Sequence, residues 1–205
     1  MMLPLFILSL TVHEWAHAFS AWKLGDDTAA SQGRLTLNPL VHIDLLGTIA
    51  LPLLGVPFGW AKPVPVNPAR FRPTVSMSGG MALTAGAGPL SNLVLAVLAT
   101  VSIGLLYRFA PAFVASSTPV VPMLGELLFL NVALAVFNLL PVPPLDGSRV
   151  VAWLLPRGLQ DGWRQVEQFA PFLLLAVFLY GARVVSSPIN AVSRYLVGLI
   201  SLIAA

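Results

Sequence analysis

Long apolar runs with few polar interruptions dominate the pattern of hydrophobic and polar positions. One run covers residues 1 to about 22, and the others cover 79 to about 107, 123 to about 140, 169 to 185 and 189 to 205. A helix needs about 20 apolar residues to cross the hydrocarbon core of a bilayer. The pattern therefore predicts membrane helices, the last of them short enough to lie in the interface or to be partly re-entrant. The first run lacks a basic flank and an A-x-A site, so we expect a retained helix and not a signal peptide.

The stretch between the first two runs, residues 23–78, is rich in proline and glycine and has no helical periodicity. Within it, residues 33–38 and 58–66 favour extended backbone. Pro63 and Pro65 restrict the second piece to an edge strand or an extended strap, whose remaining N–H donors include those of Val64 and Val66. A second polar stretch, 148–168, is short and amphipathic. The predicted fold is an all-α polytopic membrane protein with a small extended or β element between its first two helices.

Composition supports a membrane location. The 205 residues are 57% hydrophobic and 9% charged, whereas soluble domains carry about 25% charged residues. The net charge of +3 comes without a basic run interleaved with aromatic residues, so we expect no nucleic-acid partner. The chain has no cysteine, which excludes disulfides and thiolate metal ligands.

The distribution of positive charge predicts the orientation. Segments 23–78 and 144–168 carry eight of the eleven lysines and arginines, namely Lys23, Arg34, Lys62, Arg70, Arg72, Arg149, Arg157 and Arg164. Because short cytoplasmic loops are enriched in these residues, we expect both segments on the cytoplasmic side.

The first run ends in a pattern that suits a metal ion. His13-Glu14-Trp15-Ala16-His17 matches H-E-x-x-H, in which two histidines one helical turn apart can reach the same Zn²⁺. Glu14 would lie beside the open metal position, where its carboxylate could take a proton from water. Three ionisable groups in an apolar segment are costly unless they have such a role.

A catalytic zinc site usually has three protein ligands, so a third must come from elsewhere. The remaining candidates are His42, Asp26, Asp27, Asp44, Glu126, Asp146, Asp161 and Glu167. Asp146 follows an apolar, proline-stiffened run and precedes a glycine, a setting in which a carboxylate needs a partner. It could also simply cap the following helix. Glu126 is predicted at the opposite membrane face, Asp161 and Glu167 on an exposed surface, and Asp26 and Asp27 in a turn that ends the first helix.

Three further residues are candidates with two interpretations each. His42 is either structural or a contact to the metal ligands or substrate. Asn92 and Asn138 are amides in membrane helices, where hydrogen bonding between helices is the simpler role. Asn138 could instead bind the substrate carbonyl or the developing oxyanion, and Asn92 is likewise a possible substrate or oxyanion contact.

The chain resembles the site-2 protease family of intramembrane zinc metalloproteases. His13-Glu-Trp-Ala-His17, Gly88-Pro-x-x-Asn92 and Asn138-Leu-Leu-Pro-Val-Pro-Pro-Leu-Asp-Gly147 carry the resemblance, and they span roughly residues 8 to 155. Asn38-Pro, His42-Ile-Asp and Gly59-Trp-Ala-Lys-Pro-Val-Pro-Val-Asn resemble short bacterial members that lack a PDZ domain.

The resemblance implies one domain over 1–205, with a three-helix catalytic core in about 1–155 and two C-terminal apolar segments in about 156–205. It also implies one Zn²⁺ held by His13, His17 and Asp146, with Glu14 as the base, in the cell membrane near its cytoplasmic face. The expected substrate is a membrane protein or peptide, held by strand addition on the extended pieces. The alternatives are a non-proteolytic membrane protein that binds or transports a metal, against which the intact Glu14 argues, and an interaction protein with a degenerate site.

Overall fold

A computed structural model describes residues 2–55, 59–116 and 118–205. These residues form helices and connecting segments and contain no β-strand. The all-α prediction is confirmed. The helix expected from Met1 begins at Met2, and Met1 itself lies outside the described residues.

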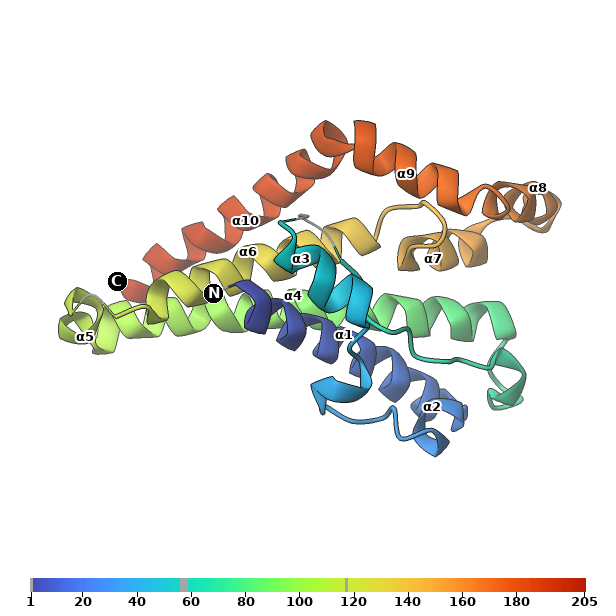
Figure 1. The fold of residues 1–205 in the computed structure, drawn as a ribbon, viewed down its shortest axis with the longest axis horizontal. Coiled ribbons are helices and arrows are strands. Elements are labelled where there is room, and N and C mark those ends of the chain that lie inside the picture. Colours follow the sequence, from blue (N-terminus) through green and yellow to red (C-terminus); the bar gives the residue numbers. More distant parts are fainter. Residues whose placement is uncertain (1, 56–58, 117) are drawn as a thin grey trace.

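Three long helices make the core: α1 (Met2–Leu24), α4 (Met77–Phe109) and α6 (Val120–Asn138). The boundaries lie within about three residues of those predicted from the apolar runs. α4 is the central element, since it packs against α1, α6, α7 (Asp146–Leu154) and α10 (Ala182–Ala204). Figure 1 shows α4 running along the whole molecule, with α1 and α6 lying against it.

Small residues allow this close packing. Ala96 and Ala99 of α4 are buried against Leu128 and Val132 of α6, and Leu196 of α10 completes the cluster. Lipid tails are as apolar as these side chains, so the hydrophobic effect does little to drive helices together in a bilayer. Helices there associate mainly through such tight contacts. The core is therefore built from alanines that bring the backbones together.

The two C-terminal segments differ from expectation in length. The fourth is the short one, α9 (Ala170–Tyr180), whereas the fifth is the 23-residue α10. Within the described residues, three helices are long and apolar enough to cross a membrane, namely α4, α6 and Val184–Ala204 of α10. The prediction that the last run is short was wrong, because the helix continues N-terminally through Arg183 and an internal proline, Pro188.

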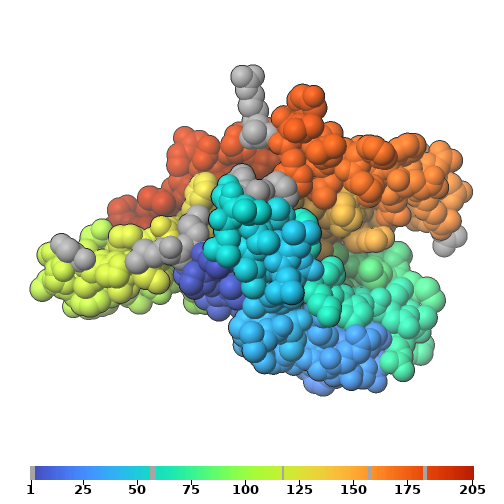
Figure 2. Space-filling view, viewed as in Figure 1, coloured from blue at the N-terminus to red at the C-terminus, as the bar shows by residue number. Residues whose placement is uncertain are grey.

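The segment between α1 and α4 consists of short turns and one extended strap. Its helical pieces are α2 (Thr28–Ser31), the 3₁₀ turn η1 (Pro39–Val41), the π-helical η2 (Leu45–Ala50), α3 (Leu51–Leu53) and the 3₁₀ turn η3 (Pro68–Arg70). Figure 2 shows η2 and α3 over the middle of one face, beside the first turns of α1. Leu45, Leu53 and Leu54 of this cover are largely exposed, as expected of residues that face lipid.

The strap, residues 59–66, is extended as predicted, while Phe58 of the predicted piece lies outside the described residues. Trp60 N–H donates to the Gly47 carbonyl at 3.3 Å, and Lys62 N–H donates to the His42 carbonyl at 2.9 Å. The strap is not a β-strand because these donors bond to η2 and to the turn at His42 and not to a second extended chain. Residues 33–38 likewise form turns and bends and not a strand.

The polar stretch after α6 forms two short helices, α7 and α8 (Arg157–Glu167). α7 packs on α4. Figure 1 shows α2 and α8 toward the end of the molecule opposite α5 (Pro111–Ala115). One helix from each of the two positively charged segments therefore lies toward the same end.

Candidate metal centre

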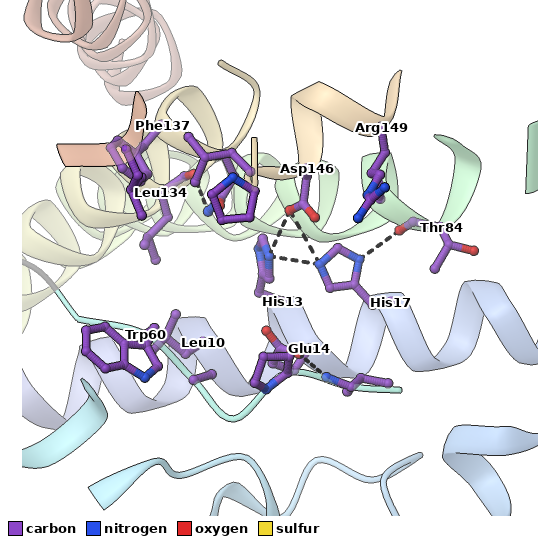
Figure 3. Close-up of a pocket in the computed structure, with 18 of the residues that line it drawn as sticks. Leu10, His13, Glu14, His17, Trp60, Thr84, Leu134, Phe137, Asp146 and Arg149 are labelled. Carbon is purple, nitrogen blue, oxygen red and sulfur yellow. Dashed lines mark hydrogen bonds and ion pairs between the residues drawn. The ribbon is translucent and has the colours of Figure 1, made fainter. Parts of the chain in front are cut away.

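Among the described residues, one group of three side chains is arranged to hold a metal ion: His13, His17 and Asp146. The two histidines lie one turn apart on α1, and Asp146 is the first residue of α7. His13 Nε2 and His17 Nε2 are 3.0 Å apart. Asp146 Oδ2 lies 3.2 Å from His13 Nε2 and 3.4 Å from His17 Nε2 (Figure 3). The structure thus brings together residues separated by about 130 positions in the sequence.

These three atoms fit a zinc ion. Ligand atoms that lie 2.0–2.1 Å from zinc are about 3.3 Å apart in a tetrahedron, close to the observed spacings. Asp146 Oδ2 is buried without a hydrogen-bond partner and lies beside two imidazole nitrogens, an arrangement that suits a cation shared by all three atoms. Two imidazoles and a carboxylate are also a donor set that zinc prefers.

His13 is oriented by a side chain of α4. Its Nδ1 lies 2.6 Å from Asn92 Oδ1, and both residues are buried. An amide oxygen only accepts hydrogen bonds, so Nδ1 carries the proton and Nε2 keeps the lone pair needed for a metal. Asn92, predicted either to join helices or to act at the site, contacts a metal-ligand candidate directly.

His17 is oriented by the backbone of α4. Its Nδ1 lies 2.7 Å from the carbonyl oxygen of Thr84, which fixes the same tautomer. The contact requires α4 to approach closely, and Gly88 provides the space. A Cβ at Gly88 would lie 2.5 Å from His17 Cε1 and 2.6 Å from His13 Cε1.

Asp146 is placed by the sharp turn that follows α6. The proline-rich run ends α6 at Asn138, and Leu145 then lies in extended backbone before α7 begins. Gly147 packs against the end of α6, where an added Cβ would lie 2.2 Å from the Leu139 carbonyl oxygen. This contact brings the first turn of α7 to the histidines.

Glu14 is held by the strap. Its Oε2 accepts a hydrogen bond from the backbone N–H of Val64 at 2.9 Å. Figure 3 shows the Glu14 carboxylate between the strap and the metal-ligand candidates. The N–H of Val64, expected to be free for a substrate strand, is therefore used by the protein itself in this state.

The candidate centre opens into a cavity of about 780 Å³. The walls are mostly apolar and come from α1, the strap, α4, α6 and α9. They include Leu10, Trp60, Met81, Phe137 and Phe178. An apolar cavity with a few convergent polar groups is typical of a binding site.

Asn138 and His42 occupy different positions relative to this cavity. Asn138 lines it, and its Nδ2 donates to the Leu134 carbonyl of its own helix at 3.0 Å. His42 does not line it. It is buried behind the strap, where Nε2 bonds to the Thr36 carbonyl at 2.9 Å and its own carbonyl accepts from Lys62.

The other acidic candidates lie elsewhere. Asp161 pairs with Arg164 on the exposed face of α8, and Asp27 pairs with Arg70 at the surface. Asp26, predicted to lie in an ordinary turn, is fully buried. It accepts hydrogen bonds from Thr28 N and, at 2.6 Å, from Asn67 N, which ties the end of the strap to the end of α1.

Comparison with known proteins places these observations in a family context. A family model described as Peptidase family M50 matches residues 108–179. "Putative zinc metalloprotease YwhC" of Bacillus subtilis is 43% identical over 188 residues, which cover 90% of this chain and 84% of that protein. "Putative zinc metalloprotease Rip2" of Mycolicibacterium smegmatis and that of Mycobacterium tuberculosis strain H37Rv are 33% and 32% identical over 174 residues, 85% of this chain and 64% of each relative. No solved structure matches the chain.

Proposed function

Since this chain belongs to peptidase family M50 and is a zinc metallopeptidase, we propose that it cuts peptide bonds within membrane-spanning segments. The observation that carries the proposal is the position of His13, Glu14 and His17 on a helix packed against α4 and α6, beside an apolar cavity. A site made for soluble substrates would not need apolar walls between membrane helices.

The proposed roles follow from the geometry. His13, His17 and Asp146 would hold the zinc, which supplies a Lewis acid that polarises the scissile carbonyl and acidifies the attacking water. Glu14 accepts a proton from this water as the oxygen bonds to the carbonyl carbon. The carbon–nitrogen bond then breaks, and Glu14 passes the proton to the leaving amine.

Substrate binding must expose a backbone that a helix hides, because a membrane-spanning helix uses its carbonyls in its own hydrogen bonds. The substrate would therefore unwind in the cavity. Asn138 lines the cavity and has a second amide N–H beyond the one on Leu134, so it can donate to a substrate carbonyl or oxyanion. His42 acts at a distance, by holding the strap through Lys62.

We place the centre near the cytoplasmic face. The charged segments include α2 and α8, which lie toward the end of the molecule where α1 ends, and His17 lies in the C-terminal half of α1. The chain is proposed to work as one membrane-embedded domain, since α10 packs against both α4 and α6.

The deciding experiment compares wild type with Glu14→Gln in liposomes. The substrates are a single-span membrane peptide and an unfolded soluble peptide that carries the same cleavage sequence. We expect cleavage of the membrane peptide by wild type, inhibition by a zinc chelator, and a loss of at least about a hundredfold in Glu14→Gln with zinc retained. Cleavage of the soluble peptide alone would refute the membrane substrate. Zinc binding without cleavage of any substrate would favour a metal-binding or transport role.

A further inference from the structure

A line of buried polar side chains runs from His13, away from the cavity, across the contact of α1, α4 and α6. It consists of His13 and Ser9 on α1, Asn92 on α4 and Asn131 on α6. Ser9, Asn92 and Asn131 are each 0% exposed. Unlike Asn92, Asn131 has no role predicted from the sequence, since nothing in the apolar run of α6 links it to a motif.

The orientation of the Asn131 amide is set by its neighbours. Its Nδ2 donates to the Leu127 carbonyl and to Ser9 Oγ, both at 2.9 Å. A carbonyl only accepts, and Ser9 Oγ already donates to the Leu5 carbonyl at 2.8 Å, so both partners require an amide NH₂. Asn131 Oδ1 must then face the opposite way, where it accepts from Asn92 Nδ2 at 2.8 Å.

The orientation of Asn92 follows from this contact. Its Nδ2 donates to Asn131 and, at the longer distance of 3.4 Å, to the Ser9 carbonyl. Asn92 Oδ1 is thereby directed at His13 Nδ1. His13 therefore donates to Asn92, Asn92 donates to Asn131, and Asn131 donates to the backbone of α6. Each amide has only one orientation that satisfies these contacts.

We infer that Asn131 is a positioning residue of the metal centre: it holds the Asn92 amide in one orientation and so keeps His13 in the tautomer whose Nε2 can bind zinc. The inference rests on the zinc centre proposed above. Asn131 touches neither the metal nor the substrate. It acts on the His13 tautomer through the Asn92 amide, while its bond to Ser9 Oγ ties α6 to α1. Loss of such outer contacts typically costs about 10- to 100-fold in metal affinity.

Hydrogen bonds between amides also hold membrane helices together. That purely structural role would disturb both histidines alike. The positioning role acts on His13 only, because the tautomer of His17 is fixed independently by the Thr84 carbonyl. The two histidines therefore serve as test and control within one protein.

The first test reads the tautomers directly in the full chain, purified in detergent without zinc, with ¹⁵N-labelled histidine rings. In wild type we expect His13 and His17 protonated on Nδ1, and His42 protonated on Nε2, which donates to the Thr36 carbonyl. In Asn131→Leu we expect His13 to become a mixture of both tautomers while His17 stays unchanged. An unchanged His13 signal would overturn the inference.

The second test is a double-mutant cycle on zinc affinity, measured by competition with a chelator. Asn131→Leu should bind zinc roughly tenfold more weakly than wild type. In an Asn92→Ala background the same substitution should change the affinity less than about twofold, because no amide remains to be oriented. Equal losses in both backgrounds would show a structural role and overturn the inference.

Controls separate these outcomes from failure of the fold or of the zinc centre. Thr100→Val removes a buried hydroxyl of α4, which donates to the Ala96 carbonyl of the same helix, and should leave zinc affinity unchanged. Asn131→Ala provides a smaller change if Asn131→Leu does not fold, with the same two expected results. A wild type that binds no zinc would refute the proposed centre, whereas the tautomer comparison in zinc-free protein still decides the role of Asn131.

Discussion

At the scale of single residues, three different contacts orient His13, His17 and Asp146 so that a lone pair of each points to the same position, the proposed metal site. His13 is oriented by a side-chain amide, and His17 by a backbone carbonyl. Asp146 is placed by a tight turn in which Gly147 lies against the end of α6. Together these contacts give the three ligand atoms spacings close to those of a tetrahedral zinc site.

Asp146 should be indispensable for zinc binding. Asp146→Ala removes one of three ligands and leaves two imidazoles that cannot close a tetrahedral site, so we expect metal analysis to find less than about a tenth of the wild-type zinc. Asp161→Ala removes an equivalent carboxylate from the exposed face of α8 and should keep full occupancy. Full zinc in Asp146→Ala would show that the third ligand lies elsewhere.

At the scale of elements, α4 serves as the template against which both histidines are held. Its close approach depends on Gly88, whereas a Cβ added at Gly86 of the same helix would meet nothing within 4 Å. Substituting alanine at each glycine therefore separates a steric clash with the histidines, expected only at Gly88, from the change in helix propensity, expected at both.

Gly88→Ala should lose zinc, because the added methyl group would overlap both imidazoles at 2.5–2.6 Å. Gly86→Ala should keep zinc and be neutral or more stable by up to about 1 kcal/mol, since alanine favours a helix. Zinc titration and thermal unfolding of the two variants provide the measurement. Equal zinc affinities for both variants would contradict the close approach of α4.

The strap is the second element that acts on the site, through the hydrogen bond from Val64 to Glu14. Val64→Pro deletes this donor while the flanking prolines keep the backbone extended. A hydrogen bond to a charged group contributes about 1.5–3 kcal/mol, so we expect kcat to fall by roughly tenfold or more with zinc content unchanged.

Val66→Pro is the matched control for this substitution, because the N–H of Val66 makes no hydrogen bond within the described part of the chain. It stiffens the same strap without removing a bonded donor. Steady-state kinetics of both variants, with zinc measured in parallel, test the role of the contact. If Val64→Pro were no slower than Val66→Pro, the strap would serve as packing only.

At the scale of the whole molecule, local signals in the sequence predicted the helices and the ligand candidates. Apolar runs set the bounds of α1, α4 and α6 within a few residues, and the spacing of His13 and His17 requires only that they share a helix. Asp146 became a ligand candidate because of its unusual setting beside prolines and Gly147. These features are local, so they can be interpreted before the helices are assembled.

The contacts that orient the site depend on how the helices assemble, and the sequence alone did not predict them. Asn131 is one amide in an apolar run, and its link to His13 exists only once α1, α4 and α6 pack together. The bond between Val64 and Glu14 joins residues 50 positions apart across a segment without periodicity. The burial of Asp26 likewise follows from the return of the strap to the end of α1.

The orientation in the membrane is a property of the whole molecule, and the distribution of positive charge predicts it. Eight of the eleven lysines and arginines lie in segments 23–78 and 144–168, and Figure 1 shows the helices α2 and α8 of these segments toward the end opposite α5. A reporter inserted after Gly33, in an open turn where an added side chain meets nothing within 4 Å, should be active only in the cytoplasm. One inserted beside Pro111 should be active only outside. The reverse pattern would place the zinc centre near the outer face and would remove the charge argument.

Removing positive charge from the second segment offers a further check of the orientation. Replacing Arg149, Arg157 and Arg164 by glutamine should increase the share of inverted molecules if these residues hold the orientation. The share should stay unchanged if the first helix alone decides the orientation.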